Sequence, residues 1–360
     1  MSNVELIEAG DLGASERALW RSLRQSQESL SSPYFSDHWI KEVALVRDDV
    51  KIAVLLQGNG RITGFLPFQQ LQNGIALPVG GALNDYHGVI AKSDFRADFE
   101  QIMKQINVKR FDFSSIPATQ KCLSPYAWID QHSHIIDISN GLNAYLQQRK
   151  QKSSARNYRA KKRERKLVRE IGELRLEIGS KDQRVFDTLL HWKRNQYAQT
   201  NTPDVFAGKW TRNLVQNLFE RSKTDEFGAI LFALYAKDKL IACNYCLGEK
   251  DVLHSWFIAY NHEFAKYSPG LVLFEKMIEH LADTHIREID LGTGNYRFKT
   301  SLANNSRLVS SGFVGSSRFA SLIPNYEYRF RKWAELMPLG SLSELPGKAM
   351  RRIDLHRGLA

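Results

Sequence analysis

The chain has 360 residues, of which 43% are hydrophobic and 25% are charged. This composition is that of a globular protein with full-sized cores, and it excludes disordered, collagen-like and low-complexity proteins. Three cysteines are too few to staple such a chain, which fits a reducing compartment. The first segment carries Glu5, Glu8 and Asp11 instead of a signal peptide, and no apolar run approaches the roughly 20 residues that span a bilayer. We therefore expect a soluble, cytoplasmic protein.

The net charge of +11 is concentrated in one segment. Residues 149–169 contain eleven Lys or Arg and one acid, Glu164, whereas the other 339 residues carry 39 basic and 38 acidic side chains. An argument from charge therefore concerns this segment and not the protein as a whole.

The predicted elements of the first half alternate between helix and strand. A helix is predicted at 15–29, where leucines recur at helical spacing. Strands at 51–56 and 62–69 flank the turn QGNGR, which suits a hairpin. The remaining elements are a strand, a helix and a short buried strand, at 75–79, 94–107 and 110–114.

The second half repeats this plan. Its predicted helices lie at 181–200, 209–221 and 271–284, and its strands at 229–236, 240–247, 253–260 and 288–291. An offset of 178 residues places 61–62 on 239–240 and 111–113 on 289–291. The repeated order of elements indicates a tandem duplication.

The predicted fold class is α/β (α+β), with two domains that each contain a mixed central sheet flanked by helices. The expected boundaries are an N-terminal half at 1–145, a basic connecting helix at 146–180, a C-terminal domain at 181–320 and a tail at 321–360. The Pro- and Gly-containing part of the tail is expected to be a loosely attached appendage.

The sequence lacks complete motifs for several common kinds of metal site and enzyme. Cys243 and Cys246 have metal-type spacing, but in a strand positions three apart point to opposite faces, and only Cys122 remains as a third thiol. No metal site is therefore predicted. The run from Gly292 to Gly294 follows a strand, but Arg297 stands at the third glycine position of a dinucleotide loop. Dehydrogenases, nucleotide hydrolases and serine hydrolases are disfavoured.

A loop-to-helix junction at Tyr267-Ser-Pro-Gly270 follows the aromatic strand at 253–260. Ser268 at the N-cap, a proline and then Gly270 give an open helix N-terminus, whose amides and positive dipole end suit a phosphate. A capped surface helix without a ligand is the alternative.

The segment from Asp290 to Lys299 is the densest polar run beside a predicted core strand. Tyr296 can donate a proton, and Lys299, with Arg297, can hold a carboxylate, a phosphate or developing negative charge. A structural hairpin with exposed cations is the alternative. Asp290 is expected to be buried and to need a partner, either Lys299 or a backbone donor.

Two further groups are candidates for a site. His254 stands on the aromatic strand, where it is either a packing residue or a functional one. Asp85, Tyr86 and His87 precede a glycine in the small-residue loop of the first half and form a candidate substrate site. His132 and His134 are interpreted as loop residues.

Six cations of the basic segment step by 3, 4, 3, 4 and 3 residues, which places them on one helix face about 26 Å long. Such a stripe suits the phosphates of RNA, an anionic membrane or an acidic polymer, and a solvated helix face is the alternative. The six are Arg149, Lys152, Arg156, Arg159, Arg163 and Lys166.

Several short motifs occur in an order that resembles one family. They are FSDHW, GRITGFLPF, GG-LNDYHG, RFDF, SSARNYRAKKRERKL, WFIAYN-EFAKYSPG and IDLGTGNYRFK, within roughly residues 30–315. This order resembles the CelD-like acyltransferases, GNAT-superfamily proteins of bacterial cellulose and exopolysaccharide synthesis, which are distantly similar to Fem-type aminoacyl-tRNA-dependent peptidyltransferases. The resemblance implies tandem GNAT-like acyltransferase domains.

The resemblance also implies roles for the candidate residues. Tyr267, Ser268 and Gly270 take the place where GNAT proteins bind the donor pyrophosphate, although the usual Arg/Gln-x-x-Gly-x-Gly/Ala pattern is absent. Lys299 resembles the lysine at the acyl-transfer site of Fem-type enzymes, Tyr296 is the implied acid, and His254, or a water it orders, is the implied base. The backbone amides of the aromatic strand would polarise the acyl carbonyl. The implied substrate residues are Asp85, Tyr86, His87, Arg297 and Asp290.

Three functions remain open. The first is an N-acetyltransferase-like acyltransferase that uses acyl-CoA or an acyl carrier protein as co-substrate, has no tightly bound cofactor, and acts on a saccharide or cell-envelope acceptor. The second is a Fem-type transferase using aminoacyl-tRNA, with RNA as the less favoured partner. The third is a non-catalytic scaffold of a polysaccharide synthase, peripheral at the inner face of an anionic membrane. Its docking surface would be the cations of the tail: Arg329, Arg331, Lys332, Arg351 and Arg352.

Overall fold

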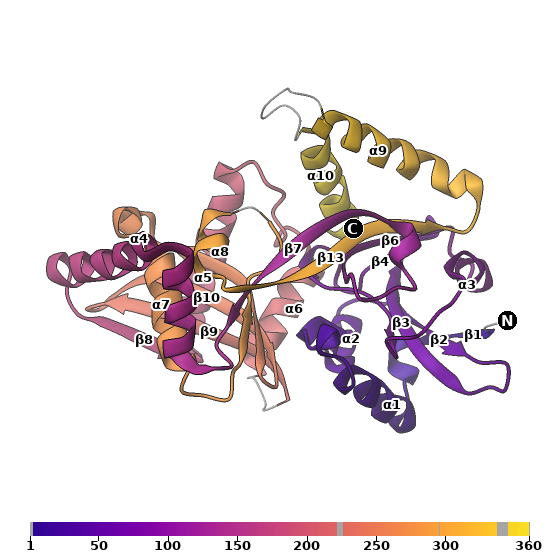
Figure 1. The fold of residues 1–360 in the computed structure, drawn as a ribbon, viewed down its shortest axis with the longest axis horizontal. Coiled ribbons are helices and arrows are strands. Elements are labelled where there is room, and N and C mark those ends of the chain that lie inside the picture. The colour runs from indigo at the N-terminus through magenta and orange to yellow at the C-terminus, as the bar shows by residue number, and fades with distance from the viewer. Residues whose placement is uncertain (1–2, 222–225, 295, 337–344, 360) are drawn as a thin grey trace. The chain divides into compact units, whose positions relative to one another are not determined.

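The computed structural model describes residues 3–221, 226–294, 296–336 and 345–359, apart from the side chains of 152–160 and of a few residues in the last two helices (Figure 1). The chain divides into two compact units, each assembled from separate stretches of sequence. Unit 1 comprises residues 1–131, 207–214 and 308–360, and unit 2 comprises residues 132–206 and 215–307.

Unit 1 is a mixed sheet with the strand order β1-β2-β3-β4-β6-β13, in which β4 and β6 are parallel and the other neighbours antiparallel. Its strands are β1 (Asn3–Glu8), β2 (Val50–Leu56), β3 (Ile62–Gln70), β4 (Ile75–Leu77), β5 (Ile90–Ala91), which pairs with β3, β6 (Arg110–Pro117) and most of β13 (Asn305–Gly315). Its helices are α1 (Ala14–Gln25), α2 (Asp37–Ala44), α3 (Phe99–Gln105), α9 (Arg318–Leu336) and α10 (Leu345–Leu359).

The side chains of β3 show how the helices cover this sheet. Trp20 of α1 packs on Phe65 with ring centroids 5.1 Å apart, whereas the neighbouring Leu66 lies in the core that contains Phe99 and Met103 of α3. Because consecutive strand residues point to opposite faces, α1 and α3 lie on opposite sides of the sheet.

Unit 2 has the strand order β8-β9-β10-β11-β12-β7, in which β11 and β12 are parallel and the other neighbours antiparallel. Its strands are the part of β7 (Ala127–Asp137) from His132 on, β8 (Leu174–Ile178), β9 (Phe227–Ala236), β10 (Lys239–Glu249), β11 (Val252–Tyr260) and β12 (Glu288–Asp290). Its helices are α4 (Gly141–Glu170), α5 (Gln183–Gln199), α6 (Lys209–Glu220), which begins in unit 1, α7 (Pro269–Leu281) and α8 (Arg297–Leu302).

Two adjacent residues of β10 separate the layers of unit 2. Tyr245 packs on Phe186 of α5, with ring centroids 5.4 Å apart, whereas Cys246 belongs to the core formed with Phe274 of α7 and Tyr145 of α4. Helices α4 and α7 therefore cover one face of the sheet, and α5 covers the other.

The two units have the same six-strand order, with the single parallel pair at the same position. This repetition agrees with the predicted duplication. The sixth strand of each unit comes from the other half of the sequence: β13 pairs with β6 in unit 1, and β7 pairs with β12 in unit 2.

Because of this exchange, the boundaries of the two units differ from the predicted domain boundaries. The first boundary falls at 131 and not at 145, the basic helix is part of unit 2, and residues from 308 on return to unit 1. The expectation of a loosely attached tail was wrong. Helix α10 packs on unit 1, where Trp210 Nε1 donates to the carbonyl of Leu359 at 3.1 Å and Gly358 lies against Gly81.

Two features are absent from the described residues. No helix in that part of the chain combines the length and apolar character needed to cross a membrane. Within the same residues, no three His, Cys, Asp or Glu side chains come together in a way that suits a metal ion.

Candidate active site

The parallel pairing of β11 with β12 ends at His254, whereas β11 continues beside β10 to Tyr260. The amide of Asn261 donates to the carbonyl of Ile241 at 3.0 Å, which makes Ile258 and Tyr260 members of non-hydrogen-bonded pairs across β10. Their backbone N–H and C=O groups therefore point away from β10, on the side where β12 has ended. The amide donors of this stretch are available to a ligand such as an acyl carbonyl.

Lys193 of α5 reaches this stretch of β11. Its Nζ donates to the carbonyl of Ile258 at 3.3 Å, which agrees with the direction derived from the ladder. Burial and, secondarily, the positive charge of Lys299 lower the pKa of Lys193 to about 8. Lys193 of α5 and Lys299 of α8 thus both place positive charge near this stretch of β11.

The loop after β11 leads into α7 through a left-handed residue, Ser268, at φ +54°. Ser268 is the N-cap residue as predicted, but its side chain makes no capping hydrogen bond, and Pro269 occupies the first helical position. A Cβ added at Gly270 would lie 3.4 Å from Ile258 Cδ1, which is an ordinary contact. Packing therefore does not require a glycine at this position.

Charged groups gather around Tyr267, next to the start of α7. Its hydroxyl donates to Glu170 Oε2 at 2.8 Å, and its ring centroid lies 5.7 Å from Lys166 Nζ and 4.8 Å from Lys266 Nζ. Tyr267 is buried, and the two lysines are exposed. Two cations and one carboxylate thus flank this helix N-terminus.

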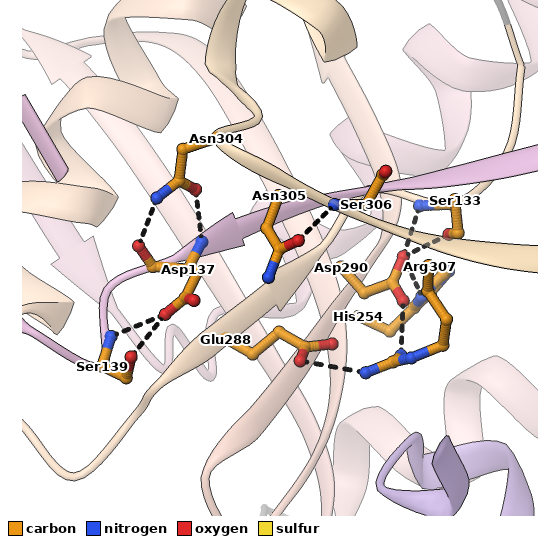
Figure 2. Close-up of polar contacts among 11 residues, drawn as sticks. Ser133, Asp137, Ser139, His254, Glu288, Asp290, Asn304, Asn305, Ser306 and Arg307 are labelled. Atoms are coloured by element: carbon orange, nitrogen blue, oxygen red, sulfur yellow. Dashed lines mark hydrogen bonds and ion pairs between the residues drawn. The ribbon is translucent and has the colours of Figure 1, made fainter. Parts of the chain in front are cut away.

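A buried polar cluster lies on the α5 face of the sheet, at the end of β12 (Figure 2). Asp290 Oδ1 accepts hydrogen bonds from Ser133 Oγ at 2.8 Å and from the amide of Gly292 at 2.7 Å. His254 Nδ1 lies 3.8 Å from the same oxygen, and Arg307 Nη1 lies 3.5 Å from the other. Asp290 therefore connects three strands and fixes the start of the glycine loop.

The predicted burial of Asp290 is confirmed, and one of the two partners predicted for it, a backbone donor, is present. Lys299 binds elsewhere: its Nζ donates to the carbonyl of Thr293 at 2.6 Å. The glycine loop is thus held at one end by a buried carboxylate and farther on by a lysine.

Glu288 is the second carboxylate of the cluster (Figure 2). Its Oε2 lies 3.1 Å from Arg307 Nη2. Burial raises the pKa of Glu288 to about 7, although the charge of Arg307 opposes that rise. Arg307 therefore neutralises two carboxylates that β12 places on the same face of the sheet.

Tyr296 and Lys299 form the accessible part of the site. Residues from Arg297 on form the short helix α8 and not the hairpin considered as an alternative. Tyr296 is 64% exposed, and its ring centroid lies 5.6 Å from Lys299 Nζ. Burial and then the charge of Lys299 lower the pKa of His134, which favours a neutral imidazole near this pair.

His254 is completely buried. It contacts Asp290 from β11 and has no surface on which a substrate could bind, so direct proton transfer to a substrate is not open to it in this structure. Its place in the cluster suits a residue that positions Asp290.

The candidate residues of the first half lie in unit 1. Asp85 is exposed, but Tyr86 and His87 are buried. Burial lowers the pKa of His87 to about 3, and its ring lies 5.2 Å from that of Phe111. Tyr86 and His87 are therefore core residues in this structure. A surface cavity of about 660 Å³ in unit 1 is lined by other residues, including Arg61 and Phe95.

The basic stripe is shorter than predicted. Arg149 is buried and forms an ion pair with Glu275 at 2.9 Å, so it attaches α4 to α7 and is not a polymer-binding residue. Arg163 is half-buried, and Lys166 is exposed beside Tyr267. The side chains of Lys152, Arg156 and Arg159 lie outside the described residues.

Sequence reasoning missed Lys193, Ser133, His134 and Arg307. One signal was available: Lys193 is four residues after the buried Leu189, so a cation stands on the apolar stripe of an amphipathic helix. His134 was expected in a loop but lies in β7, where its backbone pairs with Leu291 and Gly292.

Comparisons with known proteins concern the fold. Residues 153–300 match the acetyltransferase (GNAT) domain family. No curated protein sequence matches the chain.

Solved structures match almost the whole chain. FemX has 10% identity and a TM-score of 0.57, over 86% of this chain and 98% of FemX. The C-terminal domain of a putative lysylphosphatidylglycerol synthetase from Agrobacterium fabrum has 11% identity and a TM-score of 0.53, over 86% and 94% of the two chains. L-PGS from Bacillus licheniformis has 8% identity and a TM-score of 0.51, over 86% and 94%.

At these identities the likeness concerns the fold. Within this chain the two units repeat one sheet order, and most of unit 2 matches the GNAT domain. The chain therefore has a tandem GNAT-like fold, and its residues 153–300 match the GNAT acetyltransferase domain.

Proposed function

We propose that unit 2 catalyses acyl transfer from an activated donor to an amine or hydroxyl. The observation that carries the proposal is the end of the β11–β12 pairing at His254, beyond which the amides of Ile258 and Tyr260 point away from β10. This stretch leads directly into the loop that starts α7 and lies within the segment that matches the GNAT domain.

In the proposed step, the acceptor amine or hydroxyl attacks the acyl carbonyl carbon. The amide of Ile258 donates to the carbonyl oxygen, which becomes negative in the tetrahedral intermediate, and Lys193 and Lys299 add positive charge nearby. The bond from the acyl carbon to the donor's sulfur or oxygen then breaks. Tyr296 gives a proton to the leaving group, and the acceptor's proton passes to His134 or to water.

The donor phosphate is assigned to the start of α7. Gly270 adds no side chain there and is half-buried, and Lys166 and Lys266 supply positive charge beside Tyr267. A coenzyme A thioester suits this arrangement, and an acyl carrier protein presents the same phosphopantetheine chemistry. We propose a saccharide or cell-envelope acceptor only because the sequence motifs resemble those of the CelD-like acyltransferases.

The test is binding and turnover with several donors. Acetyl-CoA, a long-chain acyl-CoA and deacylated tRNA are titrated side by side by calorimetry, against the wild type and Gly270→Val. We expect saturable CoA binding that weakens at least tenfold in Gly270→Val, because its side chain occupies the phosphate approach. Gly270→Ala is the matched control for loss of glycine alone. CoA binding that is equal in all three proteins contradicts the assignment of α7.

An aminoacyl-tRNA donor is the second candidate. The fold of FemX, matched over 86% of this chain, and the cations of α4 beside Tyr267 favour it. Binding to tRNA alone, falling steeply with salt and weakened by Lys166→Ala but not by Lys239→Ala, would support it over CoA. Lys239 is an equally charged, exposed residue at the start of β10. If none of the three ligands binds, an acyl carrier protein as donor or the scaffold function is favoured.

A further inference from the structure

Helix α9 presents an apolar stripe to solvent. Six large side chains of this helix are between 48% and 86% exposed. They are Phe319, Leu322, Ile323, Tyr326, Phe330 and Trp333. At 3.6 residues per turn they fall within an arc of about 100°, so they form one continuous face.

The opposite face of α9 is attached to unit 1 (Figure 1). Pro324 is buried, and Tyr328 stacks on Trp128 and Phe313 with centroid distances of 5.4 and 5.9 Å. Lys332 Nζ lies 5.2 Å from the centroid of the Trp128 ring. The helix is thus fixed by one face, and its exposed stripe is a stable surface of unit 1.

The charges beside the stripe are mainly positive. From 319 to 333 the sequence contains three cations and one acid, Glu327. Arg329 is exposed at the edge of the stripe, and Lys332 is exposed on the side of the helix that contacts Trp128. The aromatic residues of the stripe, with cations beside them, have the composition of helices that lie in a membrane interface.

We propose that α9 docks on an anionic lipid surface, with its aromatic stripe in the boundary between headgroups and acyl chains. Charge complementarity favours this occupant over a second copy of the chain, because a second copy would bring the same cations together. The docking goes beyond the proposed acyl transfer, and it is measured without any substrate.

The experiment is flotation of the full-length protein with vesicles of phosphatidylcholine, with and without phosphatidylglycerol. We expect binding to the anionic vesicles and a loss of that binding as salt rises. Phe330→Ser and Trp333→Ser should each weaken the partition by about tenfold or more. Leu45→Ser is the matched control, since Leu45 is also 53% exposed but lies at the end of α2.

Circular dichroism of each variant establishes that it folds, and Phe330→Leu should keep most of the binding because it stays apolar. Equal partition of wild type, Phe330→Ser and Trp333→Ser would overturn the proposal and assign vesicle binding to another segment, such as α4. Self-association that is abolished by Phe330→Ser, without vesicle binding, would overturn it in favour of a second copy.

Discussion

Removal of the Arg307 side chain should destabilise unit 2 far more than loss of a surface ion pair. In Arg307→Met, Glu288 and Asp290 lose the cation that lies 3.1 and 3.5 Å from them. The Arg307 side chain is 13% exposed, and those of Glu288 and Asp290 are 16% and 1% exposed. Removing one partner of such a buried pair costs about 3–5 kcal/mol, because the other charge remains buried.

The matched control is Lys51→Met, which breaks the exposed pair with Glu8 in unit 1. That change should cost less than about 1 kcal/mol. Because two units can unfold in separate steps, the assay is hydrogen exchange of peptides that contain β12, compared with peptides from β2. Protection should fall around β12 in Arg307→Met, and it should change little around β2 in Lys51→Met.

Two further measurements test the electrostatic cause. Above about pH 8, Glu288→Gln in the Arg307→Met background should recover about 1–3 kcal/mol, since one of the buried charges is then absent. The folded pKa of Glu288 is raised to about 7, so its penalty is absent below the unfolded pKa, grows as pH rises and is complete above about 7. Loss of the Arg307 charge raises this pKa further, so the Glu288 part of the cost of Arg307→Met should grow as pH rises above 7 and should disappear below it. If Arg307→Met costs no more than Lys51→Met at every pH, the buried-charge reasoning is refuted.

Three other predictions concern the site. Lys299→Ala should lower turnover by about 10²–10³ with an unchanged circular dichroism spectrum, because it removes positive charge from the transition state; an unchanged rate in steady-state assays would remove Lys299 from the mechanism. Gly270→Ala should raise the free energy of unfolding by up to about 1 kcal/mol, since its Cβ meets Ile258 at an ordinary 3.4 Å, and loss of stability in urea titration would show that the backbone needs glycine. Lys193→Met should raise the free energy of unfolding by about 2 kcal/mol at neutral pH. This difference should decline between pH 8 and 10.5, because Lys193 loses its proton at a lower pH in the folded wild type than in the unfolded chain. A stability difference between Lys193→Met and wild type that does not vary with pH would contradict the lowered pKa.

The hairpins and helices α1, α5, α6 and α7 were predictable because their signals are local, whereas α2, α8, α9 and α10 were not predicted. The turn QGNGR closes through Gly60 at φ +80° and a hydrogen bond from Gln57 N to Arg61 O, both within five residues. Strands β7 and β13 carried no such signal. Their partners are far away in sequence, and β7 mixes His132 and His134 with apolar residues, so alternation did not identify it.

The site was predictable only in part, for a related reason. Tyr296 and Lys299 come shortly after a predicted core strand, and this position identified the glycine loop as a candidate active site. The position of Asp290 in a core strand predicted that it is buried. Its partner Ser133 lies 157 residues away, and local periodicity cannot predict a contact over that separation. The loop with Asp85, Tyr86 and His87 was wrongly interpreted as a substrate site. The sequence does not show whether His87 is exposed or, as in the structure, buried against Phe111.

The exchanged sixth strands have a consequence for biosynthesis and for dissection of the gene. During translation, β6 has to wait until residues 309–315 have left the ribosome before its β13 partner exists, so unit 1 is completed after most of unit 2 has been made. A fragment that begins at residue 181 lacks the β7 strand that pairs with β12. No single cut therefore yields two complete halves, and an expression fragment for the acyltransferase-like unit must start before residue 127 and continue beyond Arg307.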